Sequence, residues 1–145
     1  MKWLTAGVCG VALLWLAGCT GQERIEIRVD GARATVELAR TPEQRARGLM
    51  QRYQLDEGEG MLLVYPRPQT ISLWMKDVPI PLDAAFFDEQ GALVNIRSMI
   101  PDGGKRVYYS QAPALYALEM KQGWFARQGI GVGARLHLPR VIRAQ

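Results

Sequence analysis

The stretch from residue 24 to residue 39 constrains the fold most, because its apolar residues alternate with polar ones on both sides of a turn. Arg24–Val29 (RIEIRV) and Ala32–Ala39 (ARATVELA) each have a period of two, which is typical of a β-strand with one buried face. Asp30–Gly31 lies between them and favours a two-residue hairpin, since type I′ turns need positive φ. The folded part therefore begins with an antiparallel pair of strands.

One helix is predicted after this hairpin. Thr41 can cap its N-terminus, Pro42 suits the first turn, and Gln44 completes a capping box. Gly48 in the helix interior predicts the close approach of another backbone. The side chains expected on the buried face have helical spacing: Ala46, Leu49, Met50 and Tyr53.

The rest of the chain predicts short strands separated by turns. Residues 61–65 (MLLVY) are a continuous apolar run, typical of a central strand, and the prolines at 66 and 68 are expected to end it. Further strands are expected at 71–75, 84–87, 92–99 and 134–138, with a strand or short helix at 115–120. Seven or eight strands and one helix favour a mostly β fold: a single antiparallel β-sandwich or partly closed barrel with a packed helix.

The N-terminal residues predict export. A positive start precedes the apolar segment Trp3–Leu16, which is too short to span a bilayer comfortably, and this pattern is typical of a secretory signal. Leu16-Ala17-Gly18-Cys19 resembles the bacterial lipobox, in which the cysteine acquires a lipid and cleavage occurs just before it. The domain prediction is therefore a lipoprotein signal peptide at 1–18, a lipidated tether at 19–23 and one β-rich domain at 24–145.

The lipobox resemblance also implies a location. Cys19 would carry acyl chains such as palmitate, and a multiply acylated cysteine is a stable membrane anchor. Thr20 follows it instead of the Asp that favours inner-membrane retention in enterobacterial lipoproteins. We therefore expect a lipid-anchored envelope protein on the periplasmic face, at the outer membrane. The alternative is an ordinary signal peptide that contains a cysteine by chance.

A set of motifs through most of the mature chain resembles the DUF192 family, a domain of unknown function. The resemblance implies a compact, β-rich single domain and no known activity. Asp77–Val78 stands where the family often has Asn-Thr. The matching motifs are Val36–Ala39, Arg47–Met50 with Arg52 and Leu55, Gly60–Leu62, Leu73–Lys76, Ile80–Asp83, Ala112–Pro113, Leu118–Glu119 and Gly123.

Charged residues in and around the most hydrophobic stretch, Leu73–Phe87, form the candidate ligand site. Their positive excess suggests a small anionic ligand such as a carboxylate or phosphate, to which arginine offers bidentate hydrogen bonds. The aromatic member can be either a pocket wall or a core side chain. The predicted ligand-binding residues are Arg47, Arg52, Trp74, Lys76, Asp83 and Glu119. The leading hypothesis is a non-enzymatic domain that binds this ligand or another envelope component.

Three alternatives stay open. Asp83 and Glu119 are weak candidates for the catalytic pair of a hydrolase acting on cell-wall glycan or peptide, which requires both carboxyls to face one cleft. The same carboxylates can instead be ion-paired with Arg47, Arg52 or Lys76, because an unpaired buried charge is costly. A structural accessory of a larger complex would expose an apolar patch.

The composition argues against several functions. The net charge is only +4 and the basic residues are scattered, so no nucleic-acid partner is expected. His137 is the only histidine, and Cys19 is the only cysteine after the signal, which disfavours zinc catalysis and Cys–His nucleophiles. No metal and no cofactor are expected. His137 alternates with leucines, so it should face solvent or a sheet edge.

Overall fold

The described part of this computed structural model, residues 21–145, contains nine strands and two short helices. The predicted signal peptide, the predicted lipobox and Cys19 lie outside it. The elements are β1 (Arg24–Val29), β2 (Ala32–Ala39), α1 (Pro42–Arg47), β3 (Glu59–Gln69), β4 (Ser72–Trp74), β5 (Leu82–Phe87), β6 (Leu93–Met99), β7 (Val107–Tyr109), β8 (Ala114–Lys121), α2 (Trp124–Arg127) and β9 (Leu136–His137). Within these residues, no helix is long and apolar enough to cross a membrane.

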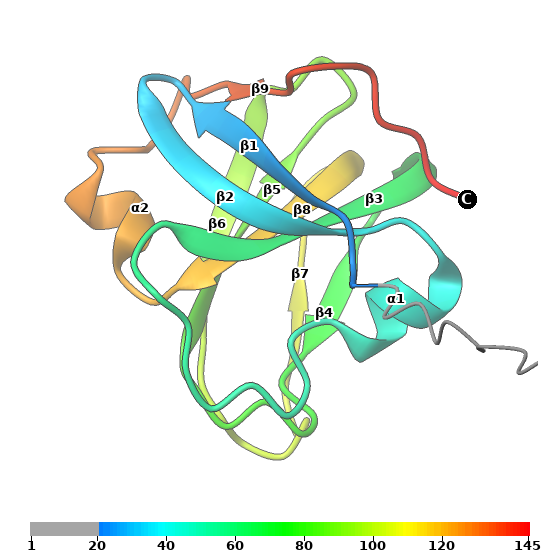
Figure 1. The fold of residues 1–145 in the computed structure, drawn as a ribbon, viewed down its shortest axis with the longest axis vertical. Coiled ribbons are helices and arrows are strands. Elements are labelled where there is room, and N and C mark those ends of the chain that lie inside the picture. Colours follow the sequence, from blue (N-terminus) through cyan, green and yellow to red (C-terminus); the bar gives the residue numbers. More distant parts are fainter. Residues whose placement is uncertain (1–20) are drawn as a thin grey trace, which may run out of the picture.

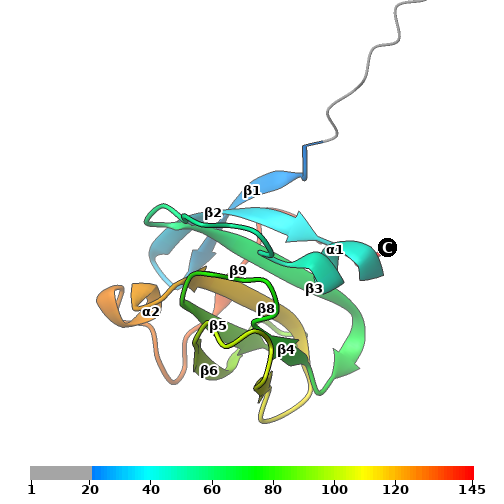
Figure 2. The ribbon, with the colours of Figure 1, turned by 90° about the horizontal axis from the view of Figure 1, so that it is seen from below.

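Seven strands form one curled sheet in the order β6–β5–β8–β3–β2–β1–β9, and β4 pairs separately with β7. The curl brings β1, β2 and β3 over β8, β5 and β6 (Figures 1 and 2). Its two edges meet where Ala92, just before β6, bridges Arg135, just before β9. The N–H of Leu136 also donates to the carbonyl of Gly91 at 2.8 Å. The predicted partly closed barrel is thereby confirmed.

The first hairpin has the predicted bounds. Arg24 pairs with Glu37 and Val29 with Ala32, and Asp30 takes the positive φ of 49° that the turn requires. Burial alternates along β1 and β2, as period two predicts for strands with one covered face.

The three neighbouring strands β5, β8 and β3 are buried on both faces. On β3, Leu62 and Val64 face the barrel interior, whereas Met61 and Leu63 face a second core. This second core lies outside the curl, where β4 contributes Leu73 and the segment after α1 contributes Leu49. The continuous apolar runs of these strands are the sequence counterpart of this double burial.

β3 does not end at its prolines, contrary to the prediction. It runs to Gln69 through Pro66 and Pro68. Its pairing with β8 shifts between Val64 and Gln69, so the prolines lie where the ladder is already interrupted. A proline cannot donate to a ladder, and an irregular segment of this kind tolerates it.

β2 and β3 pair in parallel, which is an exception in the otherwise antiparallel sheet. Parallel neighbours need a long connection, and here residues 40–58, including α1, provide it. The capping box of α1 is confirmed: the Gln44 N–H donates to Thr41 Oγ1 at 3.1 Å, and the Thr41 N–H donates to Gln44 Oε1 at 3.1 Å.

The helix is shorter than its spacing predicted. It ends at Arg47, because Gly48 takes a φ of 48° that leaves the helical region. Leu49 is buried as expected, but Tyr53 is 80% exposed, so the buried face predicted for a longer helix is wrong. Gly48 also meets no other backbone closely: the nearest atom to a Cβ placed there would be Glu119 Oε2, at 3.6 Å.

The sequence pattern of residues 124–127 did not predict the helix α2. It is a single turn after Gly123, which takes a φ of 84°. Its Trp124 and Phe125 are both buried in the barrel core, with ring centroids 5.2 Å apart in an edge-to-face arrangement. Figure 2 shows α2 at one side of the curled sheet, and both aromatic side chains belong to the barrel core.

Double burial of β3 predicts that two consecutive residues are both essential to stability. We expect Leu62→Ala and Leu63→Ala each to lower the free energy of unfolding by about 2–5 kcal/mol, because each leaves a cavity in a different core. Urea denaturation measures this. Val132→Ala, at a fully exposed position, should stay within about 0.5 kcal/mol of wild type. A cost confined to one of the two leucines would contradict the double burial.

Candidate functional site

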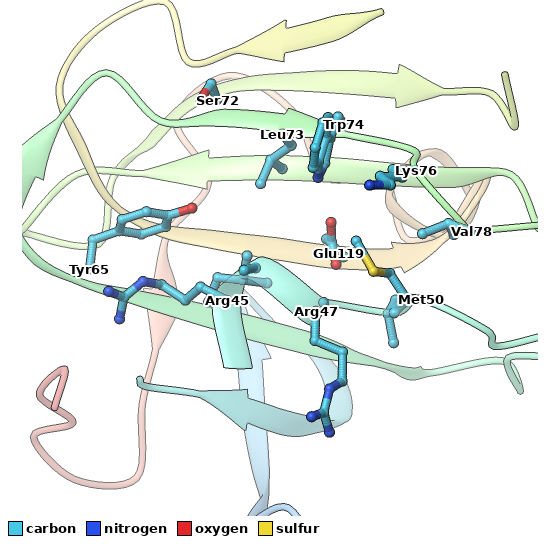
Figure 3. Close-up of a pocket in the computed structure, with 14 residues that line it drawn as sticks. Arg45, Arg47, Met50, Tyr65, Ser72, Leu73, Trp74, Lys76, Val78 and Glu119 are labelled. Carbon is cyan, nitrogen blue, oxygen red and sulfur yellow. The ribbon is translucent and has the colours of Figure 1, made fainter. Parts of the chain in front are cut away.

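A pocket of about 150 Å³ lies outside the barrel, where α1 and the residues after it approach β3, β4 and β8 (Figure 3). Its lining mixes apolar and polar side chains, and Leu63 and Leu73 from the second core are among the apolar ones. The residues of the lining that carry polar side chains are Arg45, Arg47, Tyr65, Ser72, Lys76 and Glu119. Pockets that combine apolar side chains with a few convergent polar groups are typical ligand sites.

Glu119 lies at the base of the pocket. It pairs with Met61 on one side and Ala84 on the other, so alternation along β8 directs its side chain toward the second core. The residue is only 5% exposed, and its Oε2 has no hydrogen-bond partner among the described residues. Burial raises the pKa of this carboxyl from 4.5 to about 7, because an apolar environment disfavours the charged form.

Tyr65 and Arg45 form one end of the pocket. Burial, and next the negative charge of Glu119, raise the pKa of the Tyr65 hydroxyl to about 12. The Arg45 guanidinium carbon lies 5.1 Å from the centroid of the Tyr65 ring. Arg45 Nη1 donates to the carbonyls of Arg40 and Val64, at 2.6 and 3.0 Å, so the backbone fixes its position.

Trp74 and Lys76 form the rim. Trp74 is 48% exposed, so it is a pocket wall and not a core side chain. Lys76 Nζ lies 5.4 Å from the centroid of the Trp74 ring. Figure 3 shows both side chains over Glu119. Lys76 nevertheless forms no ion pair with Glu119 or with any other carboxylate of residues 21–145.

Asp83 lies on the opposite face of the sheet from Glu119. Its neighbour Ala84 is the residue that pairs with Glu119, and successive side chains of a strand point to opposite faces. The two carboxyls therefore share no cleft, and the predicted catalytic pairing of Asp83 with Glu119 is wrong. Asp83 instead accepts hydrogen bonds from Ser98 Oγ and from the Gly123 N–H, both at 2.7 Å, which ties β5 to the turn before α2.

The predicted arginines also separate. Arg52 pairs with Glu37 at 2.6 Å and does not line the pocket. Arg47 lines the pocket, but its guanidinium points away from Glu119 (Figure 3). Within residues 21–145 no ion pair includes Glu119 or Asp83, so the expected pairing of these carboxylates with arginine or lysine is wrong.

Four of the six predicted ligand-binding residues thus line one pocket: Arg47, Trp74, Lys76 and Glu119. Tyr65 and Arg45 were missed. A signal for Tyr65 was present, since it is the one residue with a polar atom in the apolar run of residues 61–65. Arg45 gave no signal in the sequence, because its place depends on a helix that packs beside β3 only in the folded chain.

Two other sequence predictions concern the surface. His137 is exposed on β9, as expected. The outer face of the β4–β7 pair carries three exposed apolar side chains, Trp74, Val107 and Tyr109. Trp74 and Val107 are paired neighbours across the two strands. The accessory role, which requires a larger continuous apolar patch, stays a prediction.

Comparisons with known proteins agree with this architecture. The family model DUF192, described as "Uncharacterized ACR", matches residues 25–138. The chain is similar to a crystal structure from Sinorhizobium meliloti 1021 that is described as a "putative transcription regulator". The two chains share 31% identity with a TM-score of 0.77, and the match covers 83% of this chain and 97% of the Sinorhizobium chain. It is also similar to the crystal structure of a protein of unknown function from Novosphingobium aromaticivorans DSM 12444. These two chains share 28% identity with a TM-score of 0.76, and the match covers 92% of this chain and 100% of the Novosphingobium chain. No curated protein matches the sequence.

The raised pKa of Glu119 predicts a pH-dependent cost of folding. Below about pH 4.5 the Glu119 carboxyl is neutral in both the folded and the unfolded chain. Between about pH 4.5 and pH 7 it is ionised in the unfolded chain but still neutral in the folded chain, so the free energy of unfolding falls as the pH rises. Glu119→Gln removes this penalty and should raise the free energy of unfolding by about 3 kcal/mol more at pH 8 than at pH 4.

Urea denaturation at the two pH values measures the effect. The matched control is Glu89→Gln in the exposed turn between β5 and β6, which should change the unfolding free energy by no more than about 0.5 kcal/mol at either pH. An equal effect of Glu119→Gln at both pH values would contradict the raised pKa.

Proposed function

The chain belongs to the DUF192 family of uncharacterized proteins, and we propose that this member is an envelope lipoprotein with a ligand-binding domain. In this proposal, lipid on Cys19 anchors the chain to the membrane, and the pocket above Glu119 binds a small molecule that carries an anionic group. The protein binds this molecule and does not transform it.

The observation that carries the binding proposal is the unpartnered Oε2 of Glu119 at the base of a lined pocket. A buried polar atom without a hydrogen bond costs folding free energy, about 1–3 kcal/mol. An unsatisfied buried group in a native protein calls for an explanation, and perturbed carboxyls cluster at functional sites. A ligand that donates a hydrogen bond to Glu119 would remove the deficit.

The rim supports an anionic group on the ligand. Lys76 is a cation without a carboxylate partner among the described residues, and it extends over the exposed Trp74 ring. An anion placed between this ammonium and the pocket would form a charge-assisted hydrogen bond. The Trp74 ring adds a flat apolar surface on which the ligand can lie.

Binding is favoured over hydrolysis because the pocket contains only one carboxyl group among its lining residues, Glu119. Both mechanisms of glycoside hydrolysis by paired carboxylates need a second one within about 10 Å on the same cleft. Asp83, the expected second member, is turned to the other face and already holds two hydrogen bonds.

The anchor is supported by the lipobox resemblance and by how soon the fold begins after it. Gln22 Nε2 donates to the Leu38 carbonyl at 2.7 Å, and the Glu23 carbonyl accepts from the Leu38 N–H at 2.8 Å. Only Thr20 and Gly21 separate Cys19 from Gln22 in the sequence. A lipid on Cys19 would therefore hold the domain close to the membrane surface, at the outer membrane if Thr20 has the expected sorting effect.

Transcription regulation, the role in the description of the Sinorhizobium protein, is not part of the proposal. The helices of residues 21–145 have six and four residues, which is too short for a recognition helix that enters the major groove. Several surface arginines are moreover paired with carboxylates, among them Arg24 with Glu59 and Arg127 with Glu57.

The anchor predicts fatty-acid labelling that depends on one cysteine. In cells grown with an alkyne fatty acid, the wild-type chain should become labelled and fractionate with membranes, whereas Cys19→Ser should lose both properties. Cys9→Ser is the matched control, because that cysteine lies in the segment that cleavage would remove. Labelling that survives Cys19→Ser would refute the lipobox.

The binding proposal predicts a ligand-dependent thermal shift to which Lys76 contributes. The full chain in mild detergent is screened against small carboxylates and phosphates, and a ligand at about 100 times its dissociation constant should stabilise the fold by about 2.7 kcal/mol. Lys76→Met should reduce the shift, while Lys105→Met, at an exposed loop position outside the pocket, should retain it in full. A shift of wild-type size in Lys76→Met would place the ligand elsewhere.

A further inference from the structure

We propose that the pocket binds a small zwitterion, an amino acid of a few carbon atoms, with its ammonium group on Glu119 and its carboxylate toward Lys76. This inference rests on the proposed function and identifies the ligand class of the same site. It follows from three features of the pocket: a missing hydrogen-bond donor, two opposite charges that do not pair with each other, and the volume.

The missing donor comes first. Glu119 Oε2 is buried and accepts no hydrogen bond from residues 21–145. When the carboxyl is ionised, it needs both a donor and a compensating positive charge, because a buried charge is stable only when it is paired and hydrogen-bonded. A neutral hydroxyl supplies the donor alone. An ammonium group supplies both.

The second feature is the separation of the two charges. Lys76 and Glu119 both border the pocket, and Figure 3 shows Lys76 at the rim and Glu119 at the base. They form no ion pair, so their charged atoms are more than 4.0 Å apart. A cation at the rim and an anion at the base of one pocket are the electrostatic complement of a molecule with the reverse pair of charges.

The third feature limits the size of the ligand. A cavity of about 150 Å³ accommodates a molecule of about the size of benzene. That volume corresponds to roughly six to eight non-hydrogen atoms, which matches alanine, β-alanine or serine. A wall fragment with a complete sugar ring and its substituents exceeds this volume, so the pocket would hold only part of it, whereas a small amino acid fits whole.

The ionisable and charged side chains around Glu119 come from three segments. Arg45 lies on α1, Tyr65 lies on β3, and Lys76 follows β4. Arg47 also lies on α1, but its guanidinium points away from Glu119 (Figure 3). Tyr65 stays neutral because its pKa is raised to about 12. Burial holds the pKa of Glu119 at about 7. The ionised fraction of Glu119 therefore rises from about one tenth at pH 6 to about nine tenths at pH 8, and amino-acid binding should tighten about tenfold.

The experiment compares alanine with two molecules that each lack one of its charges. Propionate lacks the ammonium group, and propylamine lacks the carboxylate. Each is titrated at the same millimolar concentrations into the full chain in mild detergent, and nuclear magnetic resonance follows the Trp74 indole N–H and the Gly48 amide. We expect alanine or β-alanine to shift both signals and to bind at least about tenfold more tightly than propionate or propylamine.

Two isosteric variants test the contacts. Glu119→Gln should weaken amino-acid binding about tenfold or more and should remove its pH dependence, whereas Lys76→Met should weaken it about threefold or more at every pH. Lys105→Met should bind like wild type. Because glutamine has the shape of glutamate, loss of binding in Glu119→Gln can be separated from unfolding by its melting temperature.

The possible outcomes distinguish a failure of the zwitterion inference from a failure of the proposed binding function. If propionate binds as tightly as alanine and needs Lys76, the pocket is an anion site, the zwitterion inference is wrong and the proposed function stands. If alanine binds equally well to Glu119→Gln, the inference is also overturned. If neither the amino acids nor any carboxylate or phosphate shifts the Trp74 and Gly48 signals, both the inference and the binding function fall.

Discussion

The fold depends on the burial of β5, β8 and β3 on both of their faces. Their side chains are apolar in both directions, so one layer of covering structure cannot remove them from water. The sheet covers one face by curling, which brings β1 and β2 over the interior. The other face is covered by β4, by the loops around it and by the segment that follows α1. Two cores on one sheet account for most of the buried apolar side chains.

The pocket occurs where the second covering layer is incomplete. Glu119 occupies a position on β8 whose neighbours on the same face, Met61 and Ala84, belong to the second core. An apolar residue there would complete this core, and the carboxyl is kept instead, with its pKa raised by burial. Gly48 ends α1 just above it and leaves room, since no side chain of its own fills the space near Oε2.

Local sequence patterns predicted much of this fold and less of the site. Alternation of apolar and polar residues predicted β1 and β2, and the Thr41 capping box predicted the start of α1. The family motifs included Lys76 and Glu119. The errors arose where non-local contacts decide. Tyr53 has helical spacing but lies beyond the turn at Gly48, and Arg52 finds its carboxylate on β2 at Glu37. No residue close to Tyr53 or Arg52 in the sequence indicates either outcome.

The sequence by itself determined the local features, because period, turn chemistry and capping act over a few residues. It also contains Leu16–Cys19, which resembles a lipobox and lies outside the described residues. Only the tertiary structure decided which charged groups meet. Asp83 and Glu119 differ in face because β5 and β8 pair in a register that places Ala84, and not Asp83, opposite Glu119. A shift of one residue in that register would have exchanged the faces, and no local pattern in either strand fixes it.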